Sequence, residues 1–205
     1  NKFISNFLKF CRKNQPALYL NELLQHQVER REGKGNTVFL QAPDVKNGVG
    51  GLRDYQGVLW MSKVKFNLEN IDGLVDRKYL TEQEAKSFED AYSFLLRVRN
   101  ELHFRSTRPV DILHLEKQPE IALGLGYEQD DIFRRVEAFM GDYYTKAQTI
   151  HQLCGILEER LVHASSGNTS RISFKNVLNA YRSPPLRKVD EFDLQEGILS
   201  SSDME

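Results

Sequence analysis

Apolar residues recur every three or four positions along most of the chain, which is the spacing of one face of a helix. This pattern predicts a helical segment over residues 3–11, which Pro16 punctuates, and a second helix that carries Leu20, Leu23, Leu24 and Val28 and ends near Gly33 and Gly35. Residues 37–40 are β-branched or apolar and lie between helix breakers, so they are the best candidate for a strand.

The same spacing predicts three helices in the middle of the chain. The first follows Gly51, and a short one covers about residues 71–77. The third starts at Thr81, because Thr81 and Glu84 stand at the spacing of a capping box, and it should end before Pro109.

Two more helices complete the pattern. Pro119 can start a short helix that stops at Gly124 or Gly126, and Asp130 or Asp131 caps the longest helix, which runs to about His163. The predicted buried stripe of this longest helix consists of Phe133, Val136, Met140, Tyr143, Tyr144, Ala147, Ile150, Cys154 and Leu157.

These elements predict an all-α fold: an antiparallel helical bundle with a glycine-rich loop and a short irregular or β-hairpin tail. We expect N-terminal helices over residues 1–36, the main helical domain over residues 37–165, and a linker with a C-terminal extension over residues 166–205. The hairpin would span residues 189–199 around Gly197.

Composition and charge narrow the classes of function. Of the 205 residues, 40% are hydrophobic and 28% are charged, which is typical of a globular protein rather than a disordered chain. The formal net charge of −1 provides no overall field that would attract nucleic acid or an anionic membrane. No apolar run approaches the roughly 18 residues of a membrane span. We therefore predict neither nucleic acid nor membrane as a partner.

The two cysteines, Cys11 and Cys154, lack the spacing of a metal site and lie among apolar residues. Buried thiols of this kind indicate a reducing compartment, so we predict a cytoplasmic protein. The chain starts with Asn1 and not with Met, which favours a fragment of a longer polypeptide.

The most informative local feature is a glycine-rich loop, residues 42–51, which precedes a predicted helix. Such a turn can present backbone amides to an anion, and Lys46 and Arg53 flank it, while Asp54 suits the first turn of the helix. The loop lacks the Gly-Lys-Ser/Thr of a Walker A motif and the βαβ context of a dinucleotide site. The alternative is a tight helix-entry turn that needs small residues.

A second feature is the arginine row, which consists of Arg97, Glu101, Arg105 and Arg108. Steps of three and four residues place them on one helical face, if the helix extends that far. The row is either a basic surface that docks a phosphate or a protein, or a solvated face held by salt bridges.

No other pattern carries catalytic chemistry. The histidines form no metal-binding pair, and only His103, beside the arginine row, has a setting that suggests a role. No serine lies in a nucleophile elbow. The residues therefore predict no catalytic group and no metal ligand in this chain.

Residues 43–46, Pro-Asp-Val-Lys, and residues 50–54, Gly-Gly-Leu-Arg-Asp, resemble the central helical region of the protein-PII uridylyltransferases. These are the bifunctional uridylyltransferase/uridylyl-removing enzymes of bacterial nitrogen control. The resemblance continues in later stretches such as residues 96–103, Leu-Arg-Val-Arg-Asn-Glu-Leu-His, and covers most of residues 37–199. The chain departs from the family's usual Glu at Ala42 and from its usual Pro at Val49.

The resemblance implies that the full enzyme transfers UMP from UTP to a tyrosine of the PII signal protein, with Mg²⁺ as its metal. The Gly-Ser motif and the Asp-x-Asp pair of the family's nucleotidyltransferase domain are missing from this chain, so we expect no activity and no cofactor in it alone. The implied partners are the nucleotidyltransferase domain of the same polypeptide and PII.

Four residues are then expected to form a wall that faces the nucleotide or the catalytic domain: Lys46, Gly50, Gly51 and Arg53. Asp54 is expected to fix Arg53 or a helix end. Two alternatives stay open. The chain could be a non-catalytic module that docks a protein through Arg97, Arg105 and Arg108. It could also be the helical domain of a glutamine-synthetase adenylyltransferase-like enzyme.

Overall fold

The structure of the chain is a computed structural model. It describes residues 6–11, 16–163, 192–195 and 198–201, the last two ranges by their backbone only. The chain divides into two compact units, Asn1–Gly167 and Asn168–Glu205. Each unit is described by itself.

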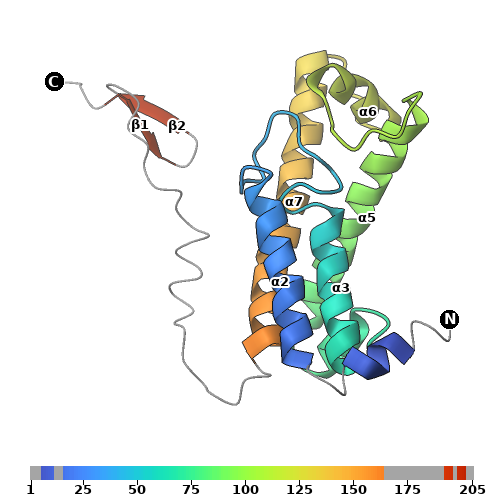
Figure 1. Cartoon of the computed structure of the whole chain (residues 1–205). Helices are drawn as coiled ribbons and strands as arrows, with labels where there is room; N and C mark the ends of the chain where they lie inside the picture. Colours follow the sequence, from blue (N-terminus) through green and yellow to red (C-terminus); the bar gives the residue numbers. More distant parts are fainter. Residues whose placement is uncertain (1–5, 12–15, 164–191, 196–197, 202–205) are drawn as a thin grey trace. The chain divides into compact units, whose positions relative to one another are not determined.

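Four long helices build the first unit: α2 (Pro16–Glu32), α3 (Leu52–Phe66), α5 (Glu82–Phe104) and α7 (Ile132–His163). Their directions alternate in the bundle (Figure 1), and α7 packs against the other three. The predicted all-α fold is confirmed. None of the helices in the described ranges is both long enough and apolar enough to cross a membrane.

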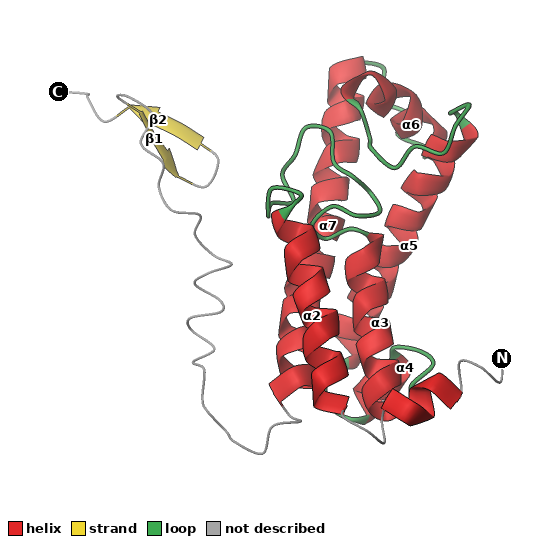
Figure 2. Cartoon of the chain, in the orientation of Figure 1, coloured by secondary structure: helices red, strands yellow, loops and turns green. Residues whose placement is uncertain are grey.

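Short helical elements join the long ones. They are a turn of helix at residues 6–11, α4 (Asp72–Asp76), the 3₁₀ turn η1 (Leu115–Lys117) and α6 (Gln118–Gly124). Figure 2 shows the loops between them, and the longest loops lie at the end of the bundle that also carries α6. The connection from α2 to α3, residues 33–51, lies on that side and includes the glycine-rich loop.

The predicted helix starts have the expected caps. The Thr81 hydroxyl accepts a hydrogen bond from the Glu84 amide, and the Glu84 carboxylate accepts one from the Thr81 amide, so the capping box of α5 is complete. Asp131 Oδ1 accepts from the Arg134 amide at 2.8 Å and caps α7. Both caps satisfy amides that have no partner inside a helix.

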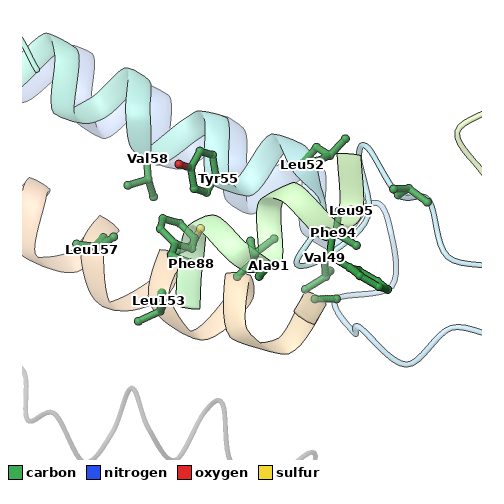
Figure 3. Close-up of a cluster of buried hydrophobic side chains, with 14 of the residues drawn as sticks. Val49, Leu52, Tyr55, Val58, Phe88, Ala91, Phe94, Leu95, Leu153 and Leu157 are labelled. Atoms are coloured by element: carbon green, nitrogen blue, oxygen red, sulfur yellow. The ribbon is translucent and has the colours of Figure 1, made fainter. Parts of the chain in front are cut away.

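The core lies between α3, α5 and α7 (Figure 3). Tyr55 of α3 stacks on Tyr92 of α5 with ring centroids 4.0 Å apart, and it tilts against Phe88 at 4.5 Å. Burial of a large apolar side chain contributes about 1.5–3 kcal/mol, so such contacts supply most of the energy that holds the helices together.

The strand predicted at residues 37–40 is absent, and that prediction is wrong. In this part of the first unit, the β-type pairing consists of one isolated bridge between Asp44 and Ile112. Phe39 is 62% exposed, and the carbonyl of Leu40 accepts a hydrogen bond from the Tyr144 hydroxyl at 2.9 Å. A strand needs a neighbouring strand, and here a side chain of α7 takes that place.

The predicted burial of one residue in the stripe on α7 is also wrong. Phe133 is 84% exposed, and its neighbour Ile132 is exposed as well. Both lie in the first turn of α7. Spacing along a helix identifies a face, but burial also requires an element opposite that face. Phe139, Tyr143, Ile150 and Leu157, further along the helix, are buried.

In the second unit, β1 (Phe192–Gln195) pairs antiparallel with β2 (Ile198–Ser201). Phe192 stands opposite Ser201, and Gln195 stands opposite Ile198. The expected turn residue Gly197, the start of the expected hairpin at residues 189–191, and the expected linker lie outside the described residues.

Candidate functional site

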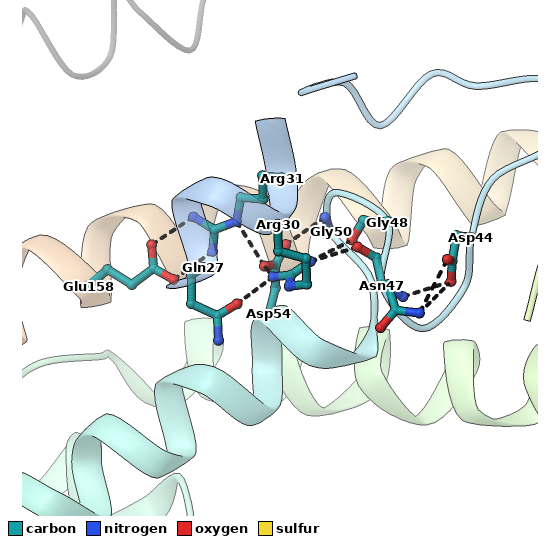
Figure 4. Close-up of polar contacts among 9 residues, drawn as sticks. All are labelled: Gln27, Arg30, Arg31, Asp44, Asn47, Gly48, Gly50, Asp54 and Glu158. Carbon is teal, nitrogen blue, oxygen red and sulfur yellow. Dashed lines mark hydrogen bonds and ion pairs between the residues drawn. The ribbon is translucent and has the colours of Figure 1, made fainter. Parts of the chain in front are cut away.

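The glycine-rich loop is closed by hydrogen bonds within itself (Figure 4). Asp44 Oδ1 accepts from the amides of Lys46 at 3.1 Å and Asn47 at 2.7 Å, and the Asp44 carbonyl accepts from the Gly48 amide at 2.8 Å. Lys34 pairs with Asp44 Oδ2 at 3.0 Å. Burial by itself raises the pKa of Asp44, but the Asn47 amide and the Lys34 ammonium lower it below its ordinary value.

Gly50 and Gly51 make the close packing of this loop achievable. Gly50 has a φ of +69°, and a Cβ there would lie 2.1 Å from the carbonyl oxygen of Ala147 in α7. The Gly50 amide donates to Asp54 Oδ2 at 2.7 Å, and the Gly51 amide donates to the Gly48 carbonyl at 3.0 Å. Since both amides are spent inside the protein, this geometry favours a tight helix-entry turn as the role of the two glycines.

Asp54 is fully buried and joins three elements. Its carboxylate accepts hydrogen bonds from Arg30, from Arg31 Nε at 2.8 Å and from the Gly50 amide. These contacts fix the end of the loop at the start of α3. The hydrogen bonds of Asp54 go to these three groups, and Arg53 is not among them.

Arg31 continues this network to α7. Its Nη1 donates to Glu158 Oε2 at 2.8 Å and its Nη2 to Glu158 Oε1 at 2.5 Å, a two-pronged ion pair with both side chains about 5% exposed. Burial raises the pKa of the Glu158 carboxyl, and the pairing with Arg31 opposes this rise. Burial would lower the pKa of Arg31, yet Glu158 and Asp54 raise it, so the guanidinium stays charged.

Arg30 ties α2 directly to the glycine-rich loop (Figure 4). Its Nη1 donates to the Asn47 carbonyl at 2.7 Å, and its Nη2 contacts Gln27 and Asp54. Sequence reasoning missed Arg30, Arg31 and Glu158. The available signal was two adjacent arginines in the last turn of a helix, and nothing local pointed to a partner 127 positions away.

Lys46 and Arg53 are accessible. Arg53 is exposed, its amide donates to the Lys46 carbonyl at 3.0 Å, and its side chain makes no polar contact with the part of the chain that the structure describes. Lys46 is 35% exposed, and its Nζ lies 3.6 Å from Asp111 Oδ2. The structure therefore separates the predicted set: these two side chains face outward, while Gly50, Gly51 and Asp54 are buried.

Lys46 belongs to a second group, the Asp111 cluster, which consists of Lys46, Arg99, His103 and Asp111. Arg99 Nε lies 2.7 Å and His103 Nε2 lies 3.1 Å from Asp111 Oδ1. Partial burial raises the pKa of Asp111, but Arg99 and His103 lower it below its ordinary value. Sequence reasoning singled out Lys46 and His103 but did not connect them.

The arginine row does not form one helical face. Because α5 ends at Phe104, Arg105 caps the helix and Arg108 lies beyond it, so the helix does not extend as far as a single face for the whole row requires. Arg105 pairs with Glu101 and with Glu120 at 3.1 Å. Arg97 lies over the ring of Phe94 at 5.7 Å. Arg97 and Arg108 are exposed.

The described residues contain no group of His, Cys, Asp or Glu side chains that could hold a metal ion. The site is thus a closed loop with accessible cations at its rim. Such a rim can bind an anion or an acidic surface through side chains.

Comparison with known proteins shows which protein family the chain is similar to. A model of the GlnD PII-uridylyltransferase family matches residues 19–158. Proteins named bifunctional uridylyltransferase/uridylyl-removing enzyme are similar to the chain. The one from Cereibacter sphaeroides is 34% identical over 145 residues, which is 71% of this chain and 16% of that protein.

Two further relatives carry the same name. The one from Pseudomonas aeruginosa strain LESB58 is 38% identical over 130 residues, or 63% of this chain and 14% of the relative. The one from Bradyrhizobium diazoefficiens is 32% identical over 161 residues, or 78% and 17%. The chain thus spans about a sixth of the length of these relatives. No solved structure gives a significant match.

Proposed function

The chain belongs to the GlnD PII-uridylyltransferase family, and from this membership we propose that it is the helical domain of an enzyme that transfers UMP from UTP to a tyrosine of the PII signal protein. The observation that carries the proposal is the match over residues 19–158, which includes the glycine-rich loop, α3 and α5. The names of the relatives favour uridylyl over adenylyl transfer.

The chemistry of transfer belongs, in this proposal, to the nucleotidyltransferase domain of the same polypeptide. Nucleotidyl transfer uses carboxylates that hold Mg²⁺ and positive groups that stabilise phosphate charge. The residues described here have no carboxylate group arranged for a metal, and they do have accessible cations. We therefore expect this chain to position and stabilise, and to have no transferase activity by itself.

Within this domain, we assign Lys46 and Arg53 to the wall that faces the nucleotide or the catalytic domain. Their side chains reach solvent, and the buried Gly50, Gly51 and Asp54 hold the loop that carries them. Arginine meets a phosphate or carboxylate as a fork and lysine as a point charge, so both suit an anionic partner.

The test measures labelling of PII by the polypeptide that combines this chain with the nucleotidyltransferase domain. We expect Arg53→Ala to lower kcat/KM for UTP and Lys86→Ala, at an exposed lysine of α5, to leave it unchanged. Equal turnover and equal UTP affinity in the Arg53 variant would remove Arg53 from the wall.

Two parallel reactions test the rest of the proposal. ATP in place of UTP should support little labelling, and efficient labelling from ATP would instead point to adenylyl transfer. The chain by itself should label no PII, and measurable labelling would contradict the assignment of the chemistry to another domain.

A second candidate function is docking of PII on the arginine row, and the exposure of Arg97 and Arg108 favours it. Arg105 suits this role less well, because Glu101 and Glu120 already pair with it. In a titration of the chain with PII, Arg108→Glu should weaken binding if this surface docks the protein. Unchanged binding would leave the row as a solvated face.

A further inference from the structure

The Asp111 cluster brings a lysine, an arginine and a histidine from two separate parts of the chain to a single carboxylate. Lys46 comes from the glycine-rich loop, and Arg99 and His103 come from one face of α5, four positions apart. Within the described residues, Asp111, on the loop after α5, is the one acidic side chain that forms an ion pair with them. Positive charge therefore exceeds negative charge at this spot.

Arg99 and Lys46 have side-chain hydrogen-bond donors without a hydrogen-bond acceptor in the described residues. Arg99 donates to Asp111 through Nε, and its two terminal nitrogens have no polar partner within the described residues. Lys46 Nζ lies 3.6 Å from Asp111, which is beyond hydrogen-bond length. The three side chains are 27–35% exposed, so a ligand from solvent can reach them.

The backbone holds these groups together before any ligand arrives. The Val45 amide donates to the Asp111 carbonyl at 2.8 Å, and the Leu113 amide donates to the Pro43 carbonyl at 2.9 Å. These bonds fix the segment that carries Lys46 against the segment that carries Asp111. A preformed group of donors binds an anion without the cost of ordering it.

We propose that Lys46, Arg99 and His103 form a binding site for a phosphate group, held in place by Asp111. The terminal nitrogens of Arg99 offer a fork, Lys46 offers a point charge, and His103 offers a further ring donor when it is protonated. For Lys46 this site deepens the proposed function and rests on it. The site also makes a separate prediction, because the chain would bind phosphate without a nucleotidyltransferase domain. The phosphate is either free, as phosphate or pyrophosphate, or part of a nucleoside triphosphate.

The test is calorimetric titration of the full chain with pyrophosphate and, separately, with UTP. We expect both ligands to bind, with Arg99→Ala lowering the affinity at least about tenfold, because hydrogen bonds between charged partners are among the strongest. Tighter binding of UTP than of pyrophosphate would identify a nucleotide as the source, and equal binding would identify free phosphate.

Lys86→Ala is the matched control, since Lys86 lies on the same helix as Arg99, is exposed and belongs neither to the Asp111 cluster nor to the arginine row. It should bind pyrophosphate as the unmodified chain does. Lys46→Ala is a second variant that keeps the interior intact, because Lys46 is partly exposed and its ion pair is long. The proposal would be overturned if the unmodified chain bound neither ligand. It would also be overturned if the Arg99→Ala and Lys46→Ala variants bound pyrophosphate as tightly as the unmodified chain does.

Discussion

Gly50 shows how much a single side-chain atom matters in this protein. It lies where the glycine-rich loop touches α7, with a positive φ and no room for a Cβ beside the carbonyl of Ala147. A glycine turn before a helix can serve ligand binding, but here the packing of the loop by itself requires glycine at this position. A turn that needs small residues was one of the two interpretations that the sequence left open, and the structure identifies what Gly50 packs against.

We expect Gly50→Ala to destabilise the fold by at least about 2–4 kcal/mol, because the new methyl group collides with backbone that cannot move freely. Denaturant unfolding followed by circular dichroism measures the loss. Gly126→Ala is the matched control: its φ is +91°, but nothing lies within 4 Å of the added Cβ. It should cost only the backbone strain of a side chain at positive φ, about 1–2 kcal/mol. Equal losses in the two variants would contradict the collision.

Asp44 predicts a dependence of stability on pH. Its pKa is lowered in the folded protein, so the carboxylate stabilises the fold above its unfolded pKa of about 3.9 and this contribution is lost as pH falls through the folded value. Asp44→Asn should lower the melting temperature near neutral pH, and the difference should shrink below about pH 4. A difference that stays constant across this range would contradict the assignment.

At the scale of elements, local signals placed most helix starts and ends. The capping box at Thr81, the proline in the first turn of α6 and the glycines after α2 act within one helical turn, and the sequence displays them directly. The strand predicted at residues 37–40 is wrong for the opposite reason. A strand depends on a distant partner, and the residue that reaches Leu40 is Tyr144, more than a hundred positions away.

The N-terminal cap of α5 should make a measurable contribution to the free energy of unfolding. Thr81→Ala removes the side chain that accepts from the Glu84 amide, so we expect a loss of about 1 kcal/mol in the free energy of unfolding. Ser87→Ala is the control, because that hydroxyl bonds a carbonyl inside the helix on an exposed face. The control should change stability by less than Thr81→Ala, and an equal effect would show that the cap contributes nothing specific.

At the scale of the whole molecule, one buried network links α2, α3 and α7 through Arg31, Asp54 and Glu158. Three charged groups are removed from water together, and each depends on the others for compensation. The network also supports the glycine-rich loop, since Asp54 binds the Gly50 amide. Packing of the helices and the shape of the candidate site are thus coupled.

Removal of Arg31 leaves the buried carboxylates of Asp54 and Glu158 without one of their positive partners. We therefore expect Arg31→Met to lower the free energy of unfolding by about 3–5 kcal/mol. Adding Glu158→Leu should recover part of this loss, because no carboxylate then stays unpaired at position 158. Lys63→Ala, which breaks an ion pair with the exposed Glu69, should cost at most about 1 kcal/mol. Additive losses in the Arg31 and Glu158 variants would show that the pair does not act as a unit.

The sequence by itself determined the helical class, most helix boundaries and the family, because each depends on residues close together or on motifs kept in order along the chain. Only the tertiary structure decided which charges meet. Arg31 reaches Glu158 across 127 positions, and Lys46 joins Arg99 and His103 at Asp111. Spacing along a chain reports neighbours within one turn, whereas buried ion pairs and accessible clusters depend on how distant segments pack.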